Sequence, residues 1–159
     1  MEKLIRHLGL ISDTHGLLRK EALDALRGSD LILHAGDVGA PEILESLREI
    51  ARVVAVRGNV DEGAWAEALP VTEVVDAGGV SIYMLHILDE LDVNPQASGF
   101  SIVVSGHSHK PGQSVKDGVL YVNPGSAGPR RFQLPVTVAR LDLQVQPWQV
   151  EFVNVEGRK

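Results

Sequence analysis

Two histidines flank one serine in the stretch VVSGHSHKPG, residues 103–112, directly behind an apolar run. The whole chain has only six histidines, so two of them this close together call for an explanation. If the extended backbone continues, alternation of side chains brings His107 and His109 to the same side. Two imidazoles aimed at one point can share a metal ion; the alternative is a turn that happens to contain histidine. The motif alone leaves both interpretations open.

Polar residues of the same kinds end other apolar runs of the chain. These runs close with SDTHG, HAGD, RGNVD and YMLH, and the residues they supply are Asp13, His15, Asp37, Asn59 and His86. Singly, each is weak evidence, because an aspartate ahead of a helix is more often an N-cap and a Gly-Asp pair is usually a turn. Ligands of open α/β sheets bind at the carboxyl ends of the strands. Recurrence at successive strand ends therefore predicts one shared metal site.

The donor atoms of this set are nitrogen and oxygen without sulfur, since the chain has no cysteine. Such mixed donors suit manganese, iron, zinc or cobalt better than calcium. The candidates exceed what one tetrahedral ion takes, so two ions with a bridging carboxylate are the simpler assignment. Paired ions roughly 3.5–4 Å apart are a recurring device for hydrolysing phosphate esters.

The first third of the chain must position several of these residues. Apolar spacing predicts helices over residues 17–28 and 41–51. Buried strands are predicted over residues 4–12, 30–36 and 52–59. This β-α-β-α-β order implies parallel strands joined by right-handed crossovers.

The remainder is predicted to be mostly β structure. Residues 71–85 form two strands around a Gly-Gly turn, and residues 101–106 form a buried strand. Further strands are expected over residues 118–126 and 136–153, whereas residues 88–99 hold weak helix signals broken by a proline. The expected fold class is α/β, with two packed sheets flanked by helices in one domain, residues 1–159.

Composition narrows the function classes. The formal charge is −6 and no lysine- or arginine-rich run occurs, so we expect no non-specific binding to nucleic acid. No apolar run reaches the roughly 18 residues of a membrane span, and we expect no membrane association. The N-terminal sequence does not resemble a signal peptide, and with the absence of cysteine this predicts a cytoplasmic protein.

The blocks DTHG, GD, GN followed by an acid, a strand-terminal histidine and GHSH, in this order, resemble the calcineurin-like metallophosphoesterases. They are most similar to the small single-domain phosphodiesterases of bacteria and archaea, of which the loop VNPGSAGPR, residues 122–130, is typical. The resemblance implies a four-layer α/β/β/α sandwich with two mixed sheets. It also implies hydrolysis of phosphate mono- or diesters by in-line attack of a metal-bridging hydroxide on phosphorus.

The resemblance further implies which residues bind metal. It places Asp13, His15 and His109 on a first ion, Asn59, His86 and His107 on a second, and Asp37 between them as a bridge. Asp37 and Asn59 are expected to be catalytic. We expect two Mn²⁺ ions, with Zn²⁺, Fe²⁺, Ni²⁺ or Co²⁺ as alternatives, and a small phosphoester as substrate.

Two departures from the family pattern affect the expected chemistry. Many members carry a histidine after the asparagine of the GN block, where it helps protonate the leaving group, and Val60 stands there in this chain. We therefore expect diesters with good leaving groups to be preferred. Asp61 either substitutes as the acid or hydrogen-bonds the loop. His86 is followed by Ile-Leu-Asp instead of the family's Gly-His, which alters the loop beside the site.

Other residues are expected to support the site or contact the substrate without binding metal. Arg57 and Arg130 are candidate contacts for substrate phosphate, with Arg131 a weaker one, and His34 and Asp61 are expected behind the ligands. Asn123 and Ser126 are expected to shape a turn near the site, and Leu88–Gly99 to influence specificity. Exposed strands near the C-terminus suggest a homodimer. The alternative functions are a phosphatase, a nucleotide pyrophosphohydrolase, or a non-catalytic scaffold of the same fold.

Overall fold

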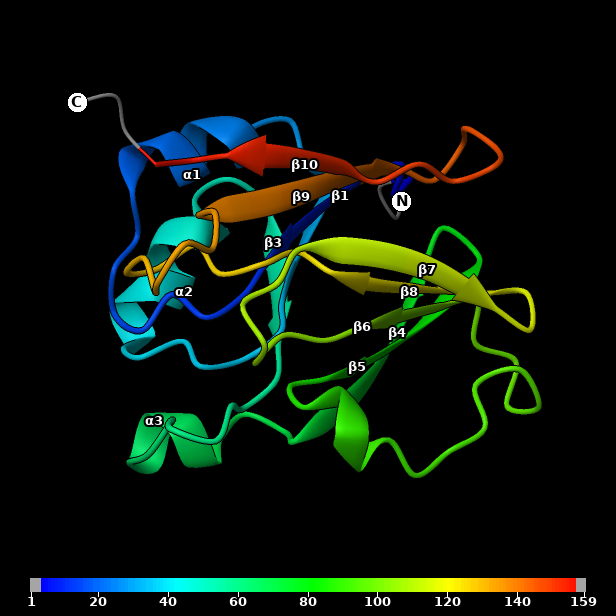
Figure 1. Ribbon diagram of the computed structural model, residues 1–159, viewed down its shortest axis with the longest axis horizontal. Coiled ribbons are helices and arrows are strands. Elements are labelled where there is room, and N and C mark those ends of the chain that lie inside the picture. The colour runs from blue at the N-terminus through cyan, green and yellow to red at the C-terminus, as the bar shows by residue number, and fades with distance from the viewer. Residues whose placement is uncertain (1–3, 157–159) are drawn as a thin grey trace.

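The computed structural model describes residues 4–156, which contain two five-stranded sheets. Sheet A has the order β10-β9-β1-β2-β3, with β1 (His7–Ile11), β2 (Leu31–His34), β3 (Arg52–Ala55), β9 (Thr137–Asp142) and β10 (Glu151–Asn154). Sheet B has the order β4-β5-β6-β8-β7, with β4 (Thr72–Ala77), β5 (Val80–Leu85), β6 (Ile102–Val104), β7 (Gly112–Lys116) and β8 (Val119–Asn123). In Figure 1, β9 and β10 lie above β7 and β8.

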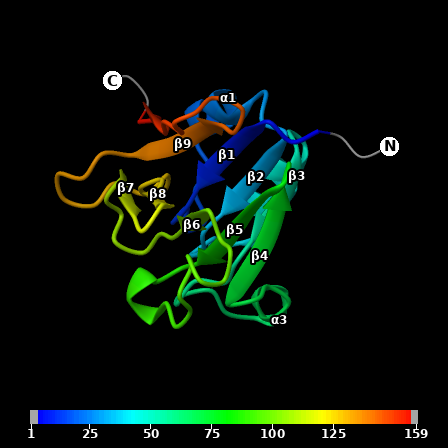
Figure 2. The same cartoon turned by 90° about the vertical axis from the view of Figure 1, so that its right-hand side faces the viewer.

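Strand direction determines where the loops meet. β1, β2 and β3 pair in parallel, as the β-α-β-α-β order predicts, and β5, β6 and β8 are also parallel. Figure 2 shows β1, β2 and β3 side by side, next to β5 and β4 of the other sheet. Loops that follow parallel strands emerge at the same edge of a sheet. The polar residues after β1, β2 and β3 therefore share one edge.

The main core lies between the sheets. Leu10 and Leu33 of sheet A meet Met84 and Ile102 of sheet B, and all four are fully buried. Their strands are continuous apolar runs, as expected for strands covered on both faces.

Two helices cover the outer face of sheet A. They are α1 (Lys20–Leu26) and α2 (Pro41–Arg48), and they pack Leu26 and Leu47 into a second core with Ile11 and Ile32. Pro41 suits the first turn of α2, because its missing N–H would have no partner there. The loop before α1 takes residues 17–19, so this helix is shorter than the sequence predicts.

The outer face of sheet B is covered differently. Segment 87–100, which contains only the 3₁₀ turn η1 (Leu88–Glu90), packs Leu91, Val93 and Phe100 against Tyr83 and Val103. The sandwich predicted from the sequence is confirmed, and its fourth layer is this segment. Weak helical periodicity and a proline in the middle of the segment explain the lack of a longer helix.

Two elements were not foreseen. β7 is exposed along its whole length, so it has no apolar pattern to reveal it, and α3 (Ala64–Glu67) is a single turn. Among residues 4–156, no helix has the length and apolar character needed to cross a membrane.

Candidate metal centre

Six of the predicted ligands form two groups of three. Donor atoms of Asp13, His15 and His109 lie within 4.8 Å of one another, and so do those of Asp37, His86 and His107. These groups coincide with the assignment that the family resemblance implies. Each group takes residues from both sheets.

The two aspartates lie between the groups. Asp37 Oδ2 is 3.1 Å from His86 Nε2 in its own group and 3.8 Å from His15 Nε2 in the other. Asp13 Oδ1 is 3.3 Å from His109 Nε2 and 3.7 Å from His86 Nε2. A carboxylate with imidazoles from both groups around it has the position that a bridging ligand needs.

The backbone is strained where these residues stand. Residues other than glycine rarely adopt a positive φ, and each instance costs about 1–3 kcal/mol. Seven described non-glycine residues do so, and five of them are predicted ligands: Asp13 (56°), His15 (48°), Asp37 (55°), His107 (70°) and His109 (64°). Strained backbone clusters at functional sites, and here most of the instances fall on predicted ligands.

Close backbone approach also shapes the centre. Gly106 lies against the hydroxyl of Ser12 and the carboxylate of Asp13, where a Cβ atom would overlap both. Gly58 lies in the same way against Asp37. A larger residue at Gly106 would push the loops of the two sheets apart, and one at Gly58 would push apart the β2 and β3 loops of sheet A.

Asp61 braces two loops of sheet A. Its carboxylate accepts backbone N–H bonds from Val38 (3.1 Å), Gly39 (3.0 Å) and Gly58 (2.9 Å), and the residue is buried. These bonds join the loop of Asp37 to the loop of Asn59. Of the two roles expected for Asp61, the geometry matches the loop hydrogen bond, since both oxygens are engaged.

His34 links two further loop segments. Its Nδ1 accepts the N–H of Gly36 (3.1 Å), so Nε2 carries the proton and donates to Thr14 Oγ1 (3.0 Å). The Thr14 hydroxyl in turn donates a hydrogen bond to the carbonyl of Val38 (2.7 Å). His34 is fully buried, and this burial lowers its pKa from the ordinary 6.5 to about 4. It is therefore a neutral link behind the ligands.

Ser12 was not predicted from the sequence, yet it fixes a ligand. Its hydroxyl donates to Asp13 Oδ2 at 2.6 Å, and the same oxygen accepts the N–H of His107 at 3.1 Å. With Oδ2 occupied, Oδ1 is the oxygen left facing the histidines, and it is buried without a hydrogen-bond partner. A serine ahead of an aspartate is too common to have signalled this role.

The turn expected at Asn123 and Ser126 supports the same loops. Asn123 Nδ2 donates to the carbonyl of Gly106 and to Ser108 Oγ, both at 3.0 Å. Ser126 Oγ donates to the carbonyl of Asp13 at 3.1 Å. The turn therefore reaches the GHSH loop of sheet B and the β1 loop of sheet A.

The electrostatics keep both aspartates ionised. Burial opposes this by raising the pKa of Asp13, but contact with His109 and the hydrogen bond from Ser12 outweigh it, and the pKa is lowered. The pKa of Asp37 is likewise lowered, because contact with His86 and the N–H of Val60 (3.0 Å) outweigh burial. Ionised carboxylates are what a cation site requires.

The histidines divide according to their surroundings. Burial lowers the pKa of His15. Burial acts the same way on His86, but the carboxylates of Asp37 and Asp13 reverse the effect, and its pKa is raised. Its Nδ1 lies 2.7 Å from the carbonyl of Ala35, which can only accept, so Nδ1 carries a proton. When the ring is neutral, Nε2 therefore keeps its lone pair, and this is the form that can bind a cation.

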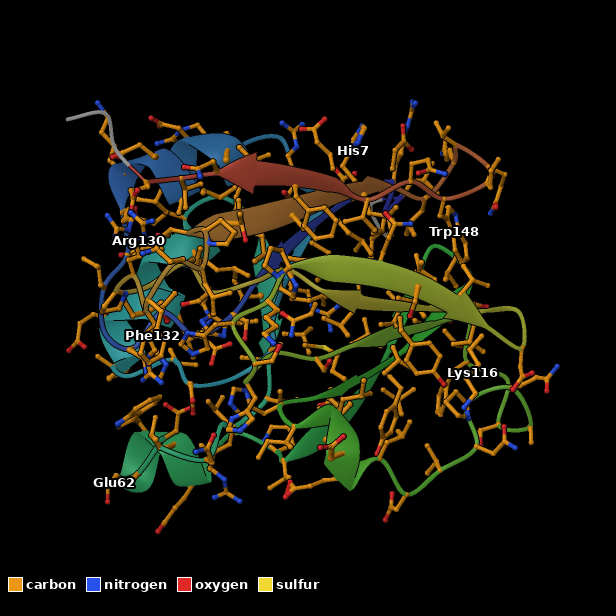
Figure 3. The ribbon with its side chains drawn as sticks, viewed as in Figure 1. His7, Glu62, Lys116, Arg130, Phe132 and Trp148 are labelled. Atoms are coloured by element: carbon orange, nitrogen blue, oxygen red, sulfur yellow. The ribbon has the colours of Figure 1, made fainter. Side chains whose placement is uncertain are left out.

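The other predicted residues lie around this centre. Asn59 is exposed on the β3 loop, in a cleft that Arg57 and His86 also line. Arg130 is paired with Glu156, Nη1 to Oε1 at 3.5 Å. Arg131 contributes positive charge near His15. Figure 3 shows Arg130 and Phe132 at one end of the molecule, with Lys116 and Trp148 at the other.

Two clefts open beside the centre. One, here named the His107 cleft, has a volume of about 420 Å³ and is lined by His107, Lys110, Gln113 and Asn123 among others. The other, the His86 cleft, has a volume of about 410 Å³ and is lined by His86, Asn59, Arg57 and Glu90 among others.

The donor set fits divalent cations. Asp13 Oδ1, His15 Nε2 and His86 Nε2 are buried, converge on one region and have no hydrogen-bond partner. Unpaired buried polar atoms are costly, so their convergence indicates a site that can bind a cation. The oxygen and imidazole donors suit first-row divalent metals.

Comparison with known proteins agrees with this geometry. The family model of the calcineurin-like phosphoesterase superfamily domain matches residues 7–146, and the chain belongs to this family of metallophosphoesterases. This confirms the family predicted from the motif blocks. The chain is 36% identical over 132 residues to a probable metallophosphoesterase of Methanocaldococcus jannaschii, covering 75% of this chain and 67% of that protein.

Solved structures share the fold. A structure described as a novel archaeal phosphodiesterase has a TM-score of 0.78 at 19% identity, covering 92% of this chain and 99% of that one. Vps29 of Chaetomium thermophilum has a TM-score of 0.75 at 21% identity, covering 93% and 97%. At these identities the likeness concerns the fold, which a phosphodiesterase and Vps29 evidently have in common.

Proposed function

We propose that this protein is a metal-dependent phosphodiesterase with a dinuclear centre. The observation that carries the proposal is the pair of adjacent donor groups, with the Asp37 carboxylate between them. The strained backbone at five of the donors adds support, since strain of this kind persists at functional sites.

Asp13, His15 and His109 would hold one cation, and Asn59, His86 and His107 the other, with Asp37 shared. We propose Mn²⁺ for both positions, because the donors are nitrogen and oxygen and no thiolate is present. A pair of such cations lowers the pKa of bound water and offsets charge on the phosphoryl oxygens.

Residues around the centre would then have distinct roles in the reaction. Asp13 and Asp37 hold negative charge at fixed atoms, because Ser12, His107 and Val60 hydrogen-bond the remaining carboxylate oxygens. Asn59 lies exposed at the rim, where its amide can meet both a cation and a substrate oxygen. Val60 is half exposed and cannot deliver a proton to a leaving group. Leaving groups that need no protonation should therefore be favoured.

The competing functions make different use of the same centre. A phosphatase would need a proton donor for poor leaving groups, and Val60 occupies the expected position. A scaffold would not need two intact donor groups. The fold does not discriminate between enzyme and scaffold, so the preserved donors are what favour the enzyme.

The test is hydrolysis of bis(p-nitrophenyl) phosphate and p-nitrophenyl phosphate by protein stripped of metal and reloaded separately with Mn²⁺, Zn²⁺ and Mg²⁺. We expect metal-dependent cleavage, fastest with Mn²⁺ and well above the monoester for the diester. Preference for the monoester would indicate a phosphatase and a proton donor other than residue 60. Stoichiometric metal binding without turnover of either ester would indicate a scaffold.

A further inference from the structure

The two clefts beside the centre share one wall. Ile87 borders both the His107 cleft and the His86 cleft. Directly after it, Leu88 and Asp89 face the first cleft, whereas Glu90 faces the second. Segment Ile87–Glu90 therefore separates two spaces, and each has a histidine of the second donor group at its border.

Each space is large enough for an organic substituent. The clefts measure about 420 and 410 Å³, within the range of small-molecule sites. A phosphate held at the donor groups would have one space on either side of Ile87. A diester carries two substituents and can fill both, whereas a monoester fills one.

Both clefts combine apolar side chains with a few charged or hydrogen-bonding ones. The lining of the His107 cleft includes one lysine, Lys110, and one carboxylate, Asp89, beside the hydrogen-bonding side chain of Gln113. Gln113 is oriented by the N–H of Val150, which it accepts at 3.0 Å. This cleft suits an uncharged arm that forms hydrogen bonds.

The His86 cleft carries more negative charge. Arg57 lines it together with Glu90 and Asp92, so the carboxylates outnumber the guanidinium. An arm bearing a further phosphate would meet repulsion here, and the single lysine of the other cleft is already matched by an aspartate. Neither space has the surplus of basic groups that a polyphosphate chain requires.

We infer that the substrate is a phosphodiester with two compact, uncharged organic arms, one on each side of the wall formed by Ile87. The inference rests on the proposed function and adds its substrate class. It makes Ile87 a residue that determines specificity without contacting the reacting atoms.

The first test compares two esters with the same p-nitrophenol leaving group under Mn²⁺: p-nitrophenyl phosphate, and the p-nitrophenyl ester of thymidine 5′-phosphate. Ile87→Ala removes the wall that contacts the retained arm. We expect the diester-to-monoester ratio of kcat/KM to fall about tenfold, mainly through KM of the diester. Val115→Ala is the matched control, because Val115 is 69% exposed and lines neither cleft.

The outcomes are distinct. No turnover of either ester by the wild type would overturn the proposed function and this inference together. Turnover with an unchanged ratio in Ile87→Ala, or an equal loss for both esters, would overturn the inference alone.

A second measurement needs no change at the wall. The wild type is given the thymidine diester with and without a 3′-phosphate, and we expect the anionic arm to lower kcat/KM about tenfold. The overall charge of −6 also repels anions, so the Glu90→Gln, Asp92→Asn double variant isolates the cleft and should remove most of the discrimination. Equal or better cleavage of the anionic diester by the wild type would overturn the uncharged-arm assignment.

Discussion

Sheet A has α1 and α2 packed on its outer face, whereas sheet B is covered there by segment 87–100 with its single 3₁₀ turn. The loops of sheet A supply both carboxylates of the donor groups, Asp13 and Asp37. The loops of sheet B supply three imidazoles, from His86, His107 and His109. Both carboxylates thus come from the sheet with helical cover, which also supplies His15, whereas the other three imidazoles come from the sheet whose cover also forms the cleft wall.

The bracing follows the same division. In sheet A, buried Asp61 and His34 hold the loops by hydrogen bonds to several backbone groups. The imidazoles of sheet B depend on contacts that cross between sheets, such as His86 Nδ1 to the carbonyl of Ala35. A buried carboxylate without its partners costs free energy, so the loops that carry Asp13 and Asp37 need to be held rigidly. Sheet A therefore fixes the carboxylates of the site, and sheet B completes the donor groups and shapes the clefts.

Removing the charge shared by the two groups tests this division most directly. Asp37→Asn should lower kcat/KM for bis(p-nitrophenyl) phosphate about a thousandfold, because the amide cannot serve two cations as a carboxylate does. The protein should stay folded, as judged by its thermal transition. Asp117→Asn is the control: this aspartate also has positive φ, at 52°, but lies outside the donor groups. Near wild-type rates for metal-loaded Asp37→Asn would sink the bridging assignment.

The frame of sheet A can be weakened without touching a ligand. Asp61→Ala leaves three backbone N–H groups without their charged acceptor, and we expect the free energy of unfolding to fall by about 3 kcal/mol. Urea denaturation of the metal-free protein measures this. Exposed Asp89→Ala should change it by less than about 0.5 kcal/mol. Equal effects of the two substitutions would contradict the bracing role.

The pH dependence of stability isolates His34. Because folding lowers its pKa from 6.5 to about 4, the unfolded chain binds the proton more tightly. The destabilisation is absent above pH 6.5 and grows as the pH falls towards 4, to about 3 kcal/mol. His34→Gln can accept and donate without titrating. Denaturation of the metal-free protein between pH 7 and 4 should therefore show a shallower decline for this variant, and parallel curves would refute the neutral link.

The smallest expected effect concerns Asp13 Oδ2, where the β1 loop of sheet A meets the GHSH loop of sheet B. Ser12→Ala removes one of the two hydrogen bonds to Asp13 Oδ2 and leaves the N–H of His107 in place. We expect Mn²⁺ affinity, measured by calorimetry, to fall about tenfold. Ser114→Ala on exposed β7 should leave it unchanged. Unaltered affinity in Ser12→Ala would show that the Gly106 contact alone fixes Asp13.

The sequence predicted the parts of the fold that alternate between long apolar runs and turn residues. The strands of the core, the parallel order of β1, β2 and β3, and the Gly-Gly hairpin follow from such patterns, and the family followed from the motif blocks. β7 was not predicted, because a fully exposed strand buries no face and so shows no alternating apolar pattern. Segment 87–100 carries no period, so its place over sheet B depends on tertiary packing alone.

For the site, residue types at strand ends identified the donors that the structure groups together. Sequence could not supply contacts between distant loops. The Ser12–Asp13–Gly106 contact and the pairing of Arg130 with Glu156 each join residues far apart in the chain. The metal-binding role of the seven predicted ligands stays a prediction that the experiments above decide.

The positive φ angles at the donor residues affect which substitutions would stabilise this chain. Glycine and asparagine accept that conformation with less strain than histidine does. A search for heat-resistant variants, scored on the metal-free chain, should therefore enrich glycine or asparagine at positions 107 and 109. Those winners would lose their imidazoles. Under the proposed function, selection for thermal stability and selection for turnover would therefore favour different residues at these two positions.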